Sequence, residues 1–343
     1  MEKVQTQCKA VDLMLNGGLA SGTVTQFFGE KAEGKSLLSL QTAFATVASG
    51  GSAVVLDTEQ SYKSYLLESW EGPLSKRVGK EVPVVEVGLK RGSWDKEAEK
   101  EERPKDRKRH APRSQVTTAF ASALNRLELP YTDLQLEEAV DIFASDLYIE
   151  PVEVKEPSVV LIQVPEVTDL IGLHGVTAGK AVSEGGRVEL HLLRTPSYNS
   201  LLRRLVKETK AKLLVYDSIS APFKASFPST QDLPARSAGL SMMLSHAQRL
   251  CVEFGLAVLT VSHVSVNPIH QWEVRPYGGA ILGYEAKFSV ELTSEHRGKE
   301  KEAVAVNPED ESAEAKRAWL ARHPAAAPSA RFGYMKFDED GIH

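Results

Sequence analysis

The chain has 343 residues, of which 42% are hydrophobic and 25% charged, so it can build one large domain or one domain with a sizeable insertion. Its formal net charge of −5 excludes a strongly basic nucleic-acid-binding protein but leaves room for a local basic patch. Two distant cysteines, Cys8 and Cys251, give neither a disulfide framework nor a metal-binding spacing. Because we find no membrane-spanning apolar run and no signal peptide, we expect a soluble intracellular protein.

The N-terminal part of the chain alternates strand-like and helix-like segments. Residues 23–28 are rich in β-branched and aromatic side chains and run into Gly29, and residues 35–49 place apolar side chains near helical spacing. A glycine pair follows this segment, as is common after a helix, and residues 53–56 then form a continuous apolar run that ends at Asp57. This order predicts a β–α–β unit of a parallel sheet that is buried on both faces.

The same alternation returns in the C-terminal half. Residues 196–210 predict a helix with a charged face, residues 213–216 predict a buried strand that closes on Asp217, and residues 238–254 predict a long helix. Further strands are expected at three places, residues 256–261, 288–292 and 332–337. The chain is therefore predicted to adopt an α/β fold with a mainly parallel central sheet flanked by helices.

The segment between these halves has a different character. Residues 95–110 are a dense mixed-charge run without a large apolar side chain, which predicts a charged flexible loop near residues 95–113 and leaves a nucleic-acid or targeting patch as the alternative. A helix is expected at residues 115–127, and strands at 146–149 and 158–164. We interpret residues 76–186 as a mixed α/β insertion into a core formed by residues 1–75 and 187–343.

A phosphate-binding loop is the clearest chemical motif. Residues 29–36 match G-x-x-x-x-G-K-[ST] and lie between a predicted strand and a predicted helix, which is the context that the motif requires. Backbone N–H groups of such a loop bind phosphate oxygens, the lysine adds charge near the β- and γ-phosphates, and the hydroxyl is a ligand of Mg²⁺. The expected nucleotide-binding residues are Gly29, Glu30, Lys31, Ala32, Glu33, Gly34, Lys35, Ser36 and Leu37.

Three further residues lie at the carboxyl ends of predicted strands, where ligands bind in open α/β sheets. Asp217 has the position of a Walker-B aspartate and is expected to hold Mg²⁺ together with Ser36. Glu59 follows the strand after the phosphate-loop helix and can orient or deprotonate the attacking water. His263 is expected to donate a hydrogen bond to the γ-phosphate, which makes Glu59, Lys35 and His263 the candidate catalytic residues.

The order of these motifs resembles the RecA/RadA recombinase family. The resemblance covers about residues 4–70 and 188–292 and the last dozen residues, and it rests on segments that match the family's phosphate loop, catalytic-glutamate strand, Walker-B strand and two DNA-binding loops. These segments are Thr6–Leu13 with Gly17–Gly22, Leu56–Glu59, Leu193–Asn199, Asp217–Arg236, Glu253–Val258, Arg275–Gly279 and Phe337–Ile342. The resemblance implies a RecA-like P-loop ATPase core that uses ATP and Mg²⁺.

Departures from the family pattern favour a RadB-type member, the archaeal recombinase paralogue. The core begins almost at Met1, residues 229–231 replace a Gly-Arg-Gly element, residues 264–276 form a short second loop, and His263 replaces a glutamine. A RadB-type protein would bind ATP, hydrolyse it weakly with or without stimulation by DNA, and act in DNA repair and homologous recombination. The alternatives are a KaiC-like or helicase-like RecA-fold ATPase and an active strand-exchange recombinase.

The same resemblance implies partners and a compartment. Single-stranded DNA would be bound weakly, because few phosphates are neutralised, and protein partners would be a RadA-type recombinase or a Holliday junction resolvase. We expect an oligomer to be possible, no membrane contact, and a cytoplasmic, nucleoid-associated location in an archaeon or a nuclear one in a eukaryote. The candidate DNA contacts are Lys224, Arg236, His270, Trp272 and Arg275.

Overall fold

The computed structural model shows the α/β core and most of the candidate site. The residues that it describes are 2–62, 67–91, 118, 121–122, 125–126, 130, 132, 147–149, 154, 156–175, 178–182, 188–192, 200–227, 232–266, 274–277, 280–294, 300–306, 333–338 and 341–342. The expected charged loop, most of the expected helix at 115–127, the segment Leu193–Asn199, and both His270 and Trp272 lie outside these residues.

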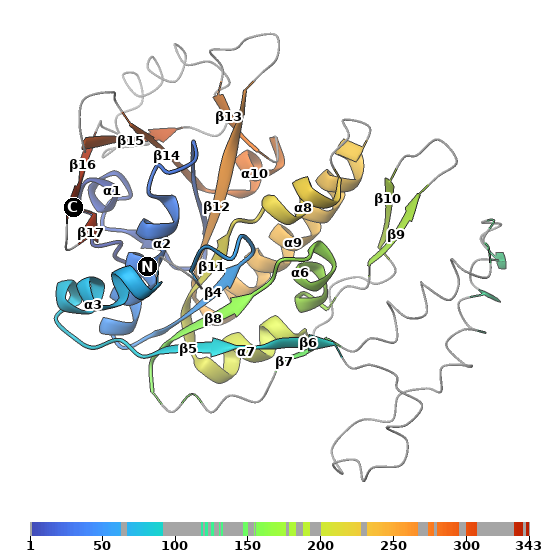
Figure 1. Ribbon diagram of the computed structural model, residues 1–343, viewed down its shortest axis with the longest axis horizontal. Coiled ribbons are helices and arrows are strands. Elements are labelled where there is room, and N and C mark those ends of the chain that lie inside the picture. Colours follow the sequence, from blue (N-terminus) through green and yellow to red (C-terminus); the bar gives the residue numbers. More distant parts are fainter. Residues whose placement is uncertain are drawn as a thin grey trace.

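A mainly parallel sheet forms the centre of the molecule (Figure 1). Seven neighbouring strands run parallel to one another. In spatial order they are β14 (Phe288–Ser294), β3 (Val24–Gly29), β12 (Ala257–Val266), β11 (Ala211–Asp217), β4 (Ser52–Asp57), β8 (Val159–Gln163) and β5 (Val84–Val87). The expected α/β fold with a mainly parallel sheet is thereby confirmed.

Antiparallel strands extend this sheet and form smaller ribbons. Beyond β14 the sheet continues through β15 (Glu300–Val306), β16 (Gly333–Asp338) and β17 (Gly341–Ile342). The far end of β12 pairs with β13 (Val274–Pro276). Three two-stranded ribbons complete the strands, β1 (Lys3–Val4) with β2 (Leu19–Ala20), β6 (Leu89–Arg91) with β7 (Leu147–Ile149), and β9 (Ala178–Val182) with β10 (Val188–Leu192).

Helices cover both faces of the parallel sheet (Figure 1). One face packs against α1 (Lys9–Met14), α2 (Lys35–Ala48) and α3 (Leu67–Val78). The other packs against α6 (Val167–Leu173), α7 (Leu201–Thr209), α8 (Ala221–Ser226), α9 (Leu233–Phe254) and α10 (Ala280–Glu285). Successive side chains of β11 enter opposite layers, Leu213 and Val215 on the first face and Leu214 and Tyr216 on the second, as the period of a strand requires.

Two strands of the expected insertion belong to the central sheet. β8 pairs in parallel with β4, and β5 pairs in parallel with β8, although both strands fall within residues 76–186. The continuous apolar run of β8 is fully buried, as the sequence of a central strand should be. The division of the chain at residues 76 and 186 stays a prediction, but β5 and β8 are part of the same layer as the phosphate-loop strand.

One expected helix begins earlier than predicted. α9 starts at Leu233 rather than near residue 238, because Pro234 lies in its first turn, where a proline is compatible with helix geometry. Gly255 ends it in the left-handed conformation, as expected. Among the residues described, the structure contains no helix with the length and apolar character needed to span a membrane.

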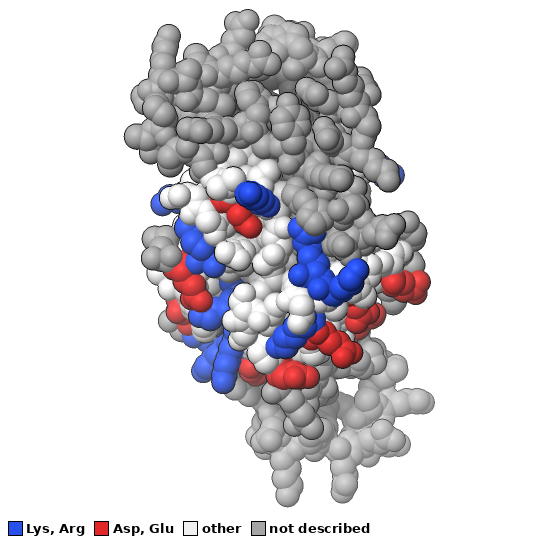
Figure 2. Space-filling model, turned by 90° about the vertical axis from the view of Figure 1, so that its left-hand side faces the viewer, with Lys and Arg blue, Asp and Glu red and all other residues white. Residues whose placement is uncertain are grey.

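Charged side chains are mixed on the face that carries α1 and α3. Figure 2 shows this side of the molecule, and on its described surface basic and acidic groups lie next to one another. Salt screens such interspersed charges, and they give little net field at a distance. The described part of this face therefore offers no extended surface of one sign to a polyanion.

Candidate nucleotide and DNA site

The carboxyl ends of four parallel strands meet at one edge of the sheet. Asp217 at the end of β11 is in register with Asp57 of β4 and with Val261 of β12, and His263 of β12 is in register with Gly29 of β3. The side chains that follow these ends therefore gather around the loop between β3 and α2. This is the crevice in which open α/β sheets bind their ligands.

The phosphate loop has the backbone geometry that the motif predicts. Gly34 is the N-cap of α2 with a φ of 81°, and Ala32 has a φ of 65°, so the chain makes left-handed turns that expose successive N–H groups at the helix start. Gly29 is needed for a different reason, since a Cβ there would lie 2.2 Å from the backbone oxygen of Leu292 on β14. The loop therefore combines an open helix N-terminus with a tight contact to the sheet beneath it.

Lys35 is buried within this loop. Its ammonium group donates a hydrogen bond of 3.0 Å to the backbone oxygen of Gly29 and another to that of Glu30. Only 6% of the residue is exposed, while Glu30 and Lys31 beside it lie at the surface. A buried ammonium held by backbone carbonyls is placed to exchange these partners for phosphate oxygens.

Ser36 and Asp217 lie close together, as a magnesium site requires. The Ser36 hydroxyl hydrogen-bonds to the Asp217 carboxylate, which is only 2% exposed. Burial raises the pKa of Asp217 to about 6, although the hydroxyl groups of Tyr62 and Ser36 partly offset this effect. A hydroxyl and a carboxylate are hard oxygen ligands of the kind that Mg²⁺ prefers beside nucleotide phosphates, so these residues fit that ion.

Tyr62 adds a contact that the sequence did not suggest. The residue is completely buried, and its hydroxyl donates a hydrogen bond of 2.6 Å to Oδ2 of Asp217. Its oxygen also lies 3.2 Å from the backbone oxygen of Ser36. Burial, together with the charge of Asp217, raises the pKa of Tyr62 well above its ordinary value, so the hydroxyl keeps its proton.

Asp57 orders the turn that presents Glu59. Its carboxylate accepts hydrogen bonds from the backbone N–H groups of Glu59, Ser61 and Tyr62 at 3.1–3.2 Å and from the side chain of Gln163 at 3.0 Å. Asp57 is fully buried and occupied by these donors. The carboxylate that remains available at the end of β4 is therefore that of Glu59.

Cross-strand hydrogen bonds fix this turn against the end of β11. The Thr58 N–H donates to the backbone oxygen of Asp217 at 2.8 Å, and the Thr58 hydroxyl donates to that of Ser218 at 2.7 Å. In return, the Ser218 N–H donates to the Thr58 hydroxyl at 2.9 Å. These bonds hold the residues around Asp217 and Glu59 at a constant separation.

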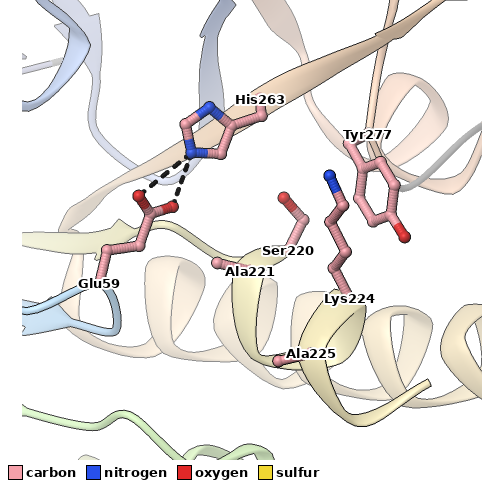
Figure 3. Close-up of a pocket in the computed structure, with 7 residues that line it drawn as sticks. All are labelled: Glu59, Ser220, Ala221, Lys224, Ala225, His263 and Tyr277. Carbon is pink, nitrogen blue, oxygen red and sulfur yellow. Dashed lines mark hydrogen bonds and ion pairs between the residues drawn. The ribbon is translucent and has the colours of Figure 1, made fainter. Parts of the chain in front are cut away.

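Glu59 and His263 form a hydrogen-bonded pair at the end of the sheet. Nε2 of His263 lies 2.8 Å and 3.1 Å from the two carboxylate oxygens of Glu59, and both side chains are about one-third exposed (Figure 3). Burial alone raises the pKa of Glu59, but hydrogen bonds from His263 and Ser218 and the nearby charges of His263 and Lys35 outweigh it and lower the pKa. Glu59 is therefore a stabilised carboxylate that is better suited to orienting a water than to removing its proton.

A cavity of about 290 Å³ opens beside this pair. Figure 3 shows Glu59 and His263 at one end and Lys224 and Tyr277 at the other, with the start of α8 forming one wall. The residues that line the cavity are Glu59, Ser220, Ala221, Lys224, Ala225, His263 and Tyr277. The cavity therefore connects the expected catalytic residues with an expected DNA contact.

Two of the expected DNA contacts meet on one aromatic ring. The Lys224 ammonium lies 5.1 Å and the Arg236 guanidinium 5.4 Å from the centre of the Tyr277 ring, both within cation–π range. The guanidinium also donates a hydrogen bond to the Tyr277 hydroxyl. The backbone N–H of Tyr277 donates to the backbone oxygen of His263 at 2.6 Å. The ring thus joins two cations to the strand end that carries His263.

The structure brings together most of the residues that the sequence singled out. The phosphate loop, Ser36, Asp217, Glu59 and His263 lie at one edge of the sheet. Arg275 lies in β13, opposite Ser265 of β12. Sequence reasoning missed Tyr62 and Tyr277, because a single tyrosine next to a motif gives no signal of its partner in space.

A comparison of the chain with protein-family models identifies its family. A model of the Rad51 family matches residues 1–70 and 195–318, which is more than half of the chain. The chain belongs to the Rad51 family. This confirms the resemblance to the RecA/RadA recombinases that the motifs indicated.

Curated relatives are similar over shorter stretches. The DNA repair and recombination protein RadB of Halobacterium salinarum is 52% identical over 54 residues, covering 16% of this chain and 23% of the relative. RadB of Methanococcoides burtonii is 45% identical over 58 residues, covering 17% and 26%. RadA of Aeropyrum pernix is 31% identical over 126 residues, covering 35% and 39%. The chain thus aligns with about a quarter of the RadB relatives' length.

Proposed function

We propose that this Rad51-family chain is an ATP-binding, weakly hydrolysing protein of RadB type that acts in DNA repair and homologous recombination. The observation that carries the proposal is the meeting of Ser36, Asp217 and Glu59 at the phosphate loop. A hydroxyl, a buried carboxylate and a partly exposed carboxylate around a helix N-terminus are the parts that phosphoryl transfer to water needs. The RadB relatives are DNA repair and recombination proteins by name, which supports a role in these processes.

Each residue has a separate task in this proposal. The N–H groups between Gly29 and Ser36 bind the phosphate oxygens of ATP, and the Lys35 ammonium leaves its two backbone carbonyls to contact the β- and γ-phosphates. Ser36 and Asp217 hold Mg²⁺, which neutralises charge on the phosphates when it is bound. Glu59 then orients the water that attacks the γ-phosphate.

Slow hydrolysis is supported by the pairing of Glu59 with His263. The carboxylate accepts hydrogen bonds from this histidine, and its pKa is lowered, so it is a weak base for water. In our proposal His263 must leave Glu59 and turn to the γ-phosphate before the water can be oriented. This exchange of partners adds a step before chemistry.

Weak binding of single-stranded DNA is the second part of the proposal. Lys224 on α8 is exposed, Arg236 at the start of α9 is only 8% exposed, and both cations contact the Tyr277 ring within one small region. Neutralising only a few phosphates gives an affinity that falls steeply with salt. Arg275, His270 and Trp272 remain candidate contacts, and Trp272→Ala should weaken binding at low salt if its ring stacks on a base.

The protein partners in this proposal are a RadA-type recombinase and a Holliday junction resolvase. The support is the likeness to the proteins named RadB and RadA. A paralogue that shares a core with the recombinase has surfaces for joining or capping its assembly, which is the role we propose. A cytoplasmic, nucleoid-associated site of action in an archaeon follows from it.

Steady-state ATP hydrolysis, with and without single-stranded DNA, tests this function. The purified chain should hydrolyse ATP slowly in the presence of Mg²⁺, and the Lys35→Ala variant should show only the background rate. A hydrolysis rate that Lys35→Ala leaves intact would mean that a contaminant carries the activity and would contradict the proposal. Strong stimulation by DNA would favour the alternative of an active strand-exchange recombinase.

A further inference from the structure

The Tyr62 hydroxyl lies between the two residues that are expected to hold magnesium. It is 2.6 Å from Oδ2 of Asp217 and 3.2 Å from the backbone oxygen of Ser36. Since a hydroxyl group has one hydrogen, the shorter contact to the carboxylate takes it. The carboxylate is thereby fixed in rotation by a donor that comes from a different strand end.

The hydroxyl is not needed to hold the rest of Tyr62 in place. The backbone N–H of Tyr62 is bound by Asp57 at 3.1 Å, and its ring packs in the apolar layer between the sheet and α2. A phenylalanine would keep both of these contacts. The oxygen atom is therefore the one part of the side chain whose contacts are confined to the Ser36–Asp217 region.

A hydroxyl that fixes a buried carboxylate has a chemical consequence for a metal ion. Residues that orient a metal-binding carboxylate determine how well it meets the ion and its bound waters. Asp217 is expected to act through the hydration shell of Mg²⁺, so the direction of its free oxygen matters. We propose that Tyr62 is a positioning residue for Mg²⁺ in the nucleotide site, acting through Asp217.

This inference rests on the proposed binding of ATP with Mg²⁺, and it assigns a role to a residue outside the P-loop and Walker-B motifs. The expected effect of losing the hydroxyl is a loss of Mg²⁺ affinity of about 10-fold or more, which is typical when a residue that orients a metal ligand is removed. Nucleotide binding without the metal should hardly change, because the hydroxyl contacts the phosphate loop at a backbone oxygen, that of Ser36, whereas phosphate oxygens bind N–H groups.

The test uses a fluorescent, slowly hydrolysed ATP analogue and the full chain. Mg²⁺ is titrated at fixed analogue concentration, and analogue binding is also measured in EDTA. Tyr62→Phe should raise the Mg²⁺ concentration at half-saturation about 10-fold or more, while the dissociation constant in EDTA stays within about twofold of the wild type. Equal half-saturation in Tyr62→Phe and the wild type would overturn the inference, and so would an equal loss in Mg²⁺ and in EDTA.

Tyr216→Phe is a matched control. Tyr216 is also completely buried, and its hydroxyl also hydrogen-bonds to a side chain, but that partner is His174 on the opposite face of the sheet. This variant should keep the wild-type response to Mg²⁺. If it shifts the Mg²⁺ midpoint as much as Tyr62→Phe, the effect comes from general loosening and the inference fails.

A second substitution keeps the test decisive if Tyr62→Phe folds poorly. Replacing Tyr62 by p-aminophenylalanine keeps a hydrogen-bond donor at the end of the ring and should keep the wild-type Mg²⁺ midpoint. A 10-fold loss in this folded variant would contradict the inference. A wild-type chain that does not bind the analogue at all would instead overturn the proposed function, so the two failures are distinguishable.

Discussion

Two neighbouring residues of β11, Tyr216 and Asp217, face opposite sides of the sheet and lie in opposite kinds of polar environment. Asp217 contacts Tyr62 and Ser36 on the side of α2, where other carboxylates and the Lys35 ammonium are close by. Tyr216 contacts His174 on the side of α6 and α9, within the apolar layer. The first environment is built around charge, and the second is neutral.

The neutral side is a short hydrogen-bonded network. Nδ1 of His174 lies 2.8 Å from Nδ1 of His246, and Nε2 of His174 lies 3.3 Å from the Tyr216 hydroxyl. A nitrogen–nitrogen hydrogen bond needs one donor and one acceptor, so at most one of these two nitrogens carries a proton. Burial lowers the pKa of His174 well below its ordinary value, consistent with an uncharged ring.

The difference shows what a buried polar group requires. At the end of β11, the buried carboxylate of Asp217 is stabilised by hydrogen bonds from the hydroxyl groups of Tyr62 and Ser36, and it belongs to the candidate magnesium site. Within the helix-covered layer, polar side chains are retained only as uncharged groups that satisfy one another. Four predictions follow from this contrast, and they are ordered from the largest expected effect to the smallest.

The two largest effects are expected on the charged side, and the first of them comes from removing its cation. Lys35→Ala deletes the ammonium group that the loop carbonyls now hold, and leaves phosphate charge unpaired at the helix start. Truncating one partner of such a charge pair costs about 2–5 kcal/mol, so ATP affinity should fall by about 30-fold or more. Isothermal titration with ATP measures this, and Lys80→Ala, at an exposed lysine just after α3, is the control. Equal losses in both variants would contradict a specific role for Lys35.

Neutralising Glu59 should separate binding from turnover. Glu59→Gln keeps the shape of the side chain but loses the carboxylate that orients water, so kcat should fall by about 10²–10⁴-fold while ATP affinity changes little. Single-turnover hydrolysis alongside equilibrium binding measures both. Glu68→Gln, a carboxylate at the start of α3, is a control that should leave both values unchanged. Wild-type turnover in Glu59→Gln would mean that another group orients the attacking water.

Protonation of His246 on the neutral side should destabilise the fold. Burial lowers the pKa of His246 to about 4. The charges of Arg249 and Arg203 lower this pKa further, and the charge of Glu253 opposes them. The unfolded chain then binds more protons than the folded chain between about pH 6.5 and 4, so this contribution to stability is present above pH 6.5 and is lost as the pH falls.

The measurement is urea unfolding at pH 7.5 and pH 5. The wild type should lose about 2 kcal/mol of unfolding free energy from His246 over this interval, in addition to what its carboxylates contribute. His246→Gln has a neutral amide at this position, so its unfolding free energy should fall by about 2 kcal/mol less than that of the wild type over the same interval. Identical pH dependence in the two proteins would mean that folding does not lower the pKa of His246.

The smallest effect is expected at the cation pair on Tyr277. Tyr277→Leu removes the ring that the exposed Lys224 and the buried Arg236 share, and a cation–π contact at an exposed site such as that of Lys224 is worth about 0.5–1 kcal/mol. Binding of single-stranded oligonucleotides at low salt should weaken by a few-fold. Tyr277→Phe keeps the ring and should lose less than Tyr277→Leu. If both variants bind as the wild type does, these two cations do not need the ring.

The sequence predicted the elements that carry strong local signals. The phosphate loop is recognised by the spacing of Gly29, Gly34 and Lys35, and the buried strands β4 and β11 by their continuous apolar runs. The positions of Glu59 and Asp217 followed from these strands, because parallel strands end at the same edge. Here local pattern and global fold agree.

The rest depended on distances that a sequence does not contain. β5 and β8 join the central sheet although the chain around them changes in composition, because pairing with β4 is a long-range interaction. Tyr62 meets Asp217 across 155 residues, and Tyr277 meets Arg236 across 41. Such pairs follow from the packing of the completed fold and leave no periodic trace in the sequence.

The ribbon formed by β12 and β13 has a mechanical consequence. β12 continues past the parallel sheet, and its residues Val264–Val266 pair only with Val274–Pro276 among the described strands. The hydrogen bond from Tyr277 to His263 lies at the root of this ribbon. The ribbon and the parallel sheet therefore share the backbone of β12, and His263 lies where one passes into the other. A load on Val264–Val266 would reach the hydrogen-bond partner of Glu59 before it reaches the rest of the sheet.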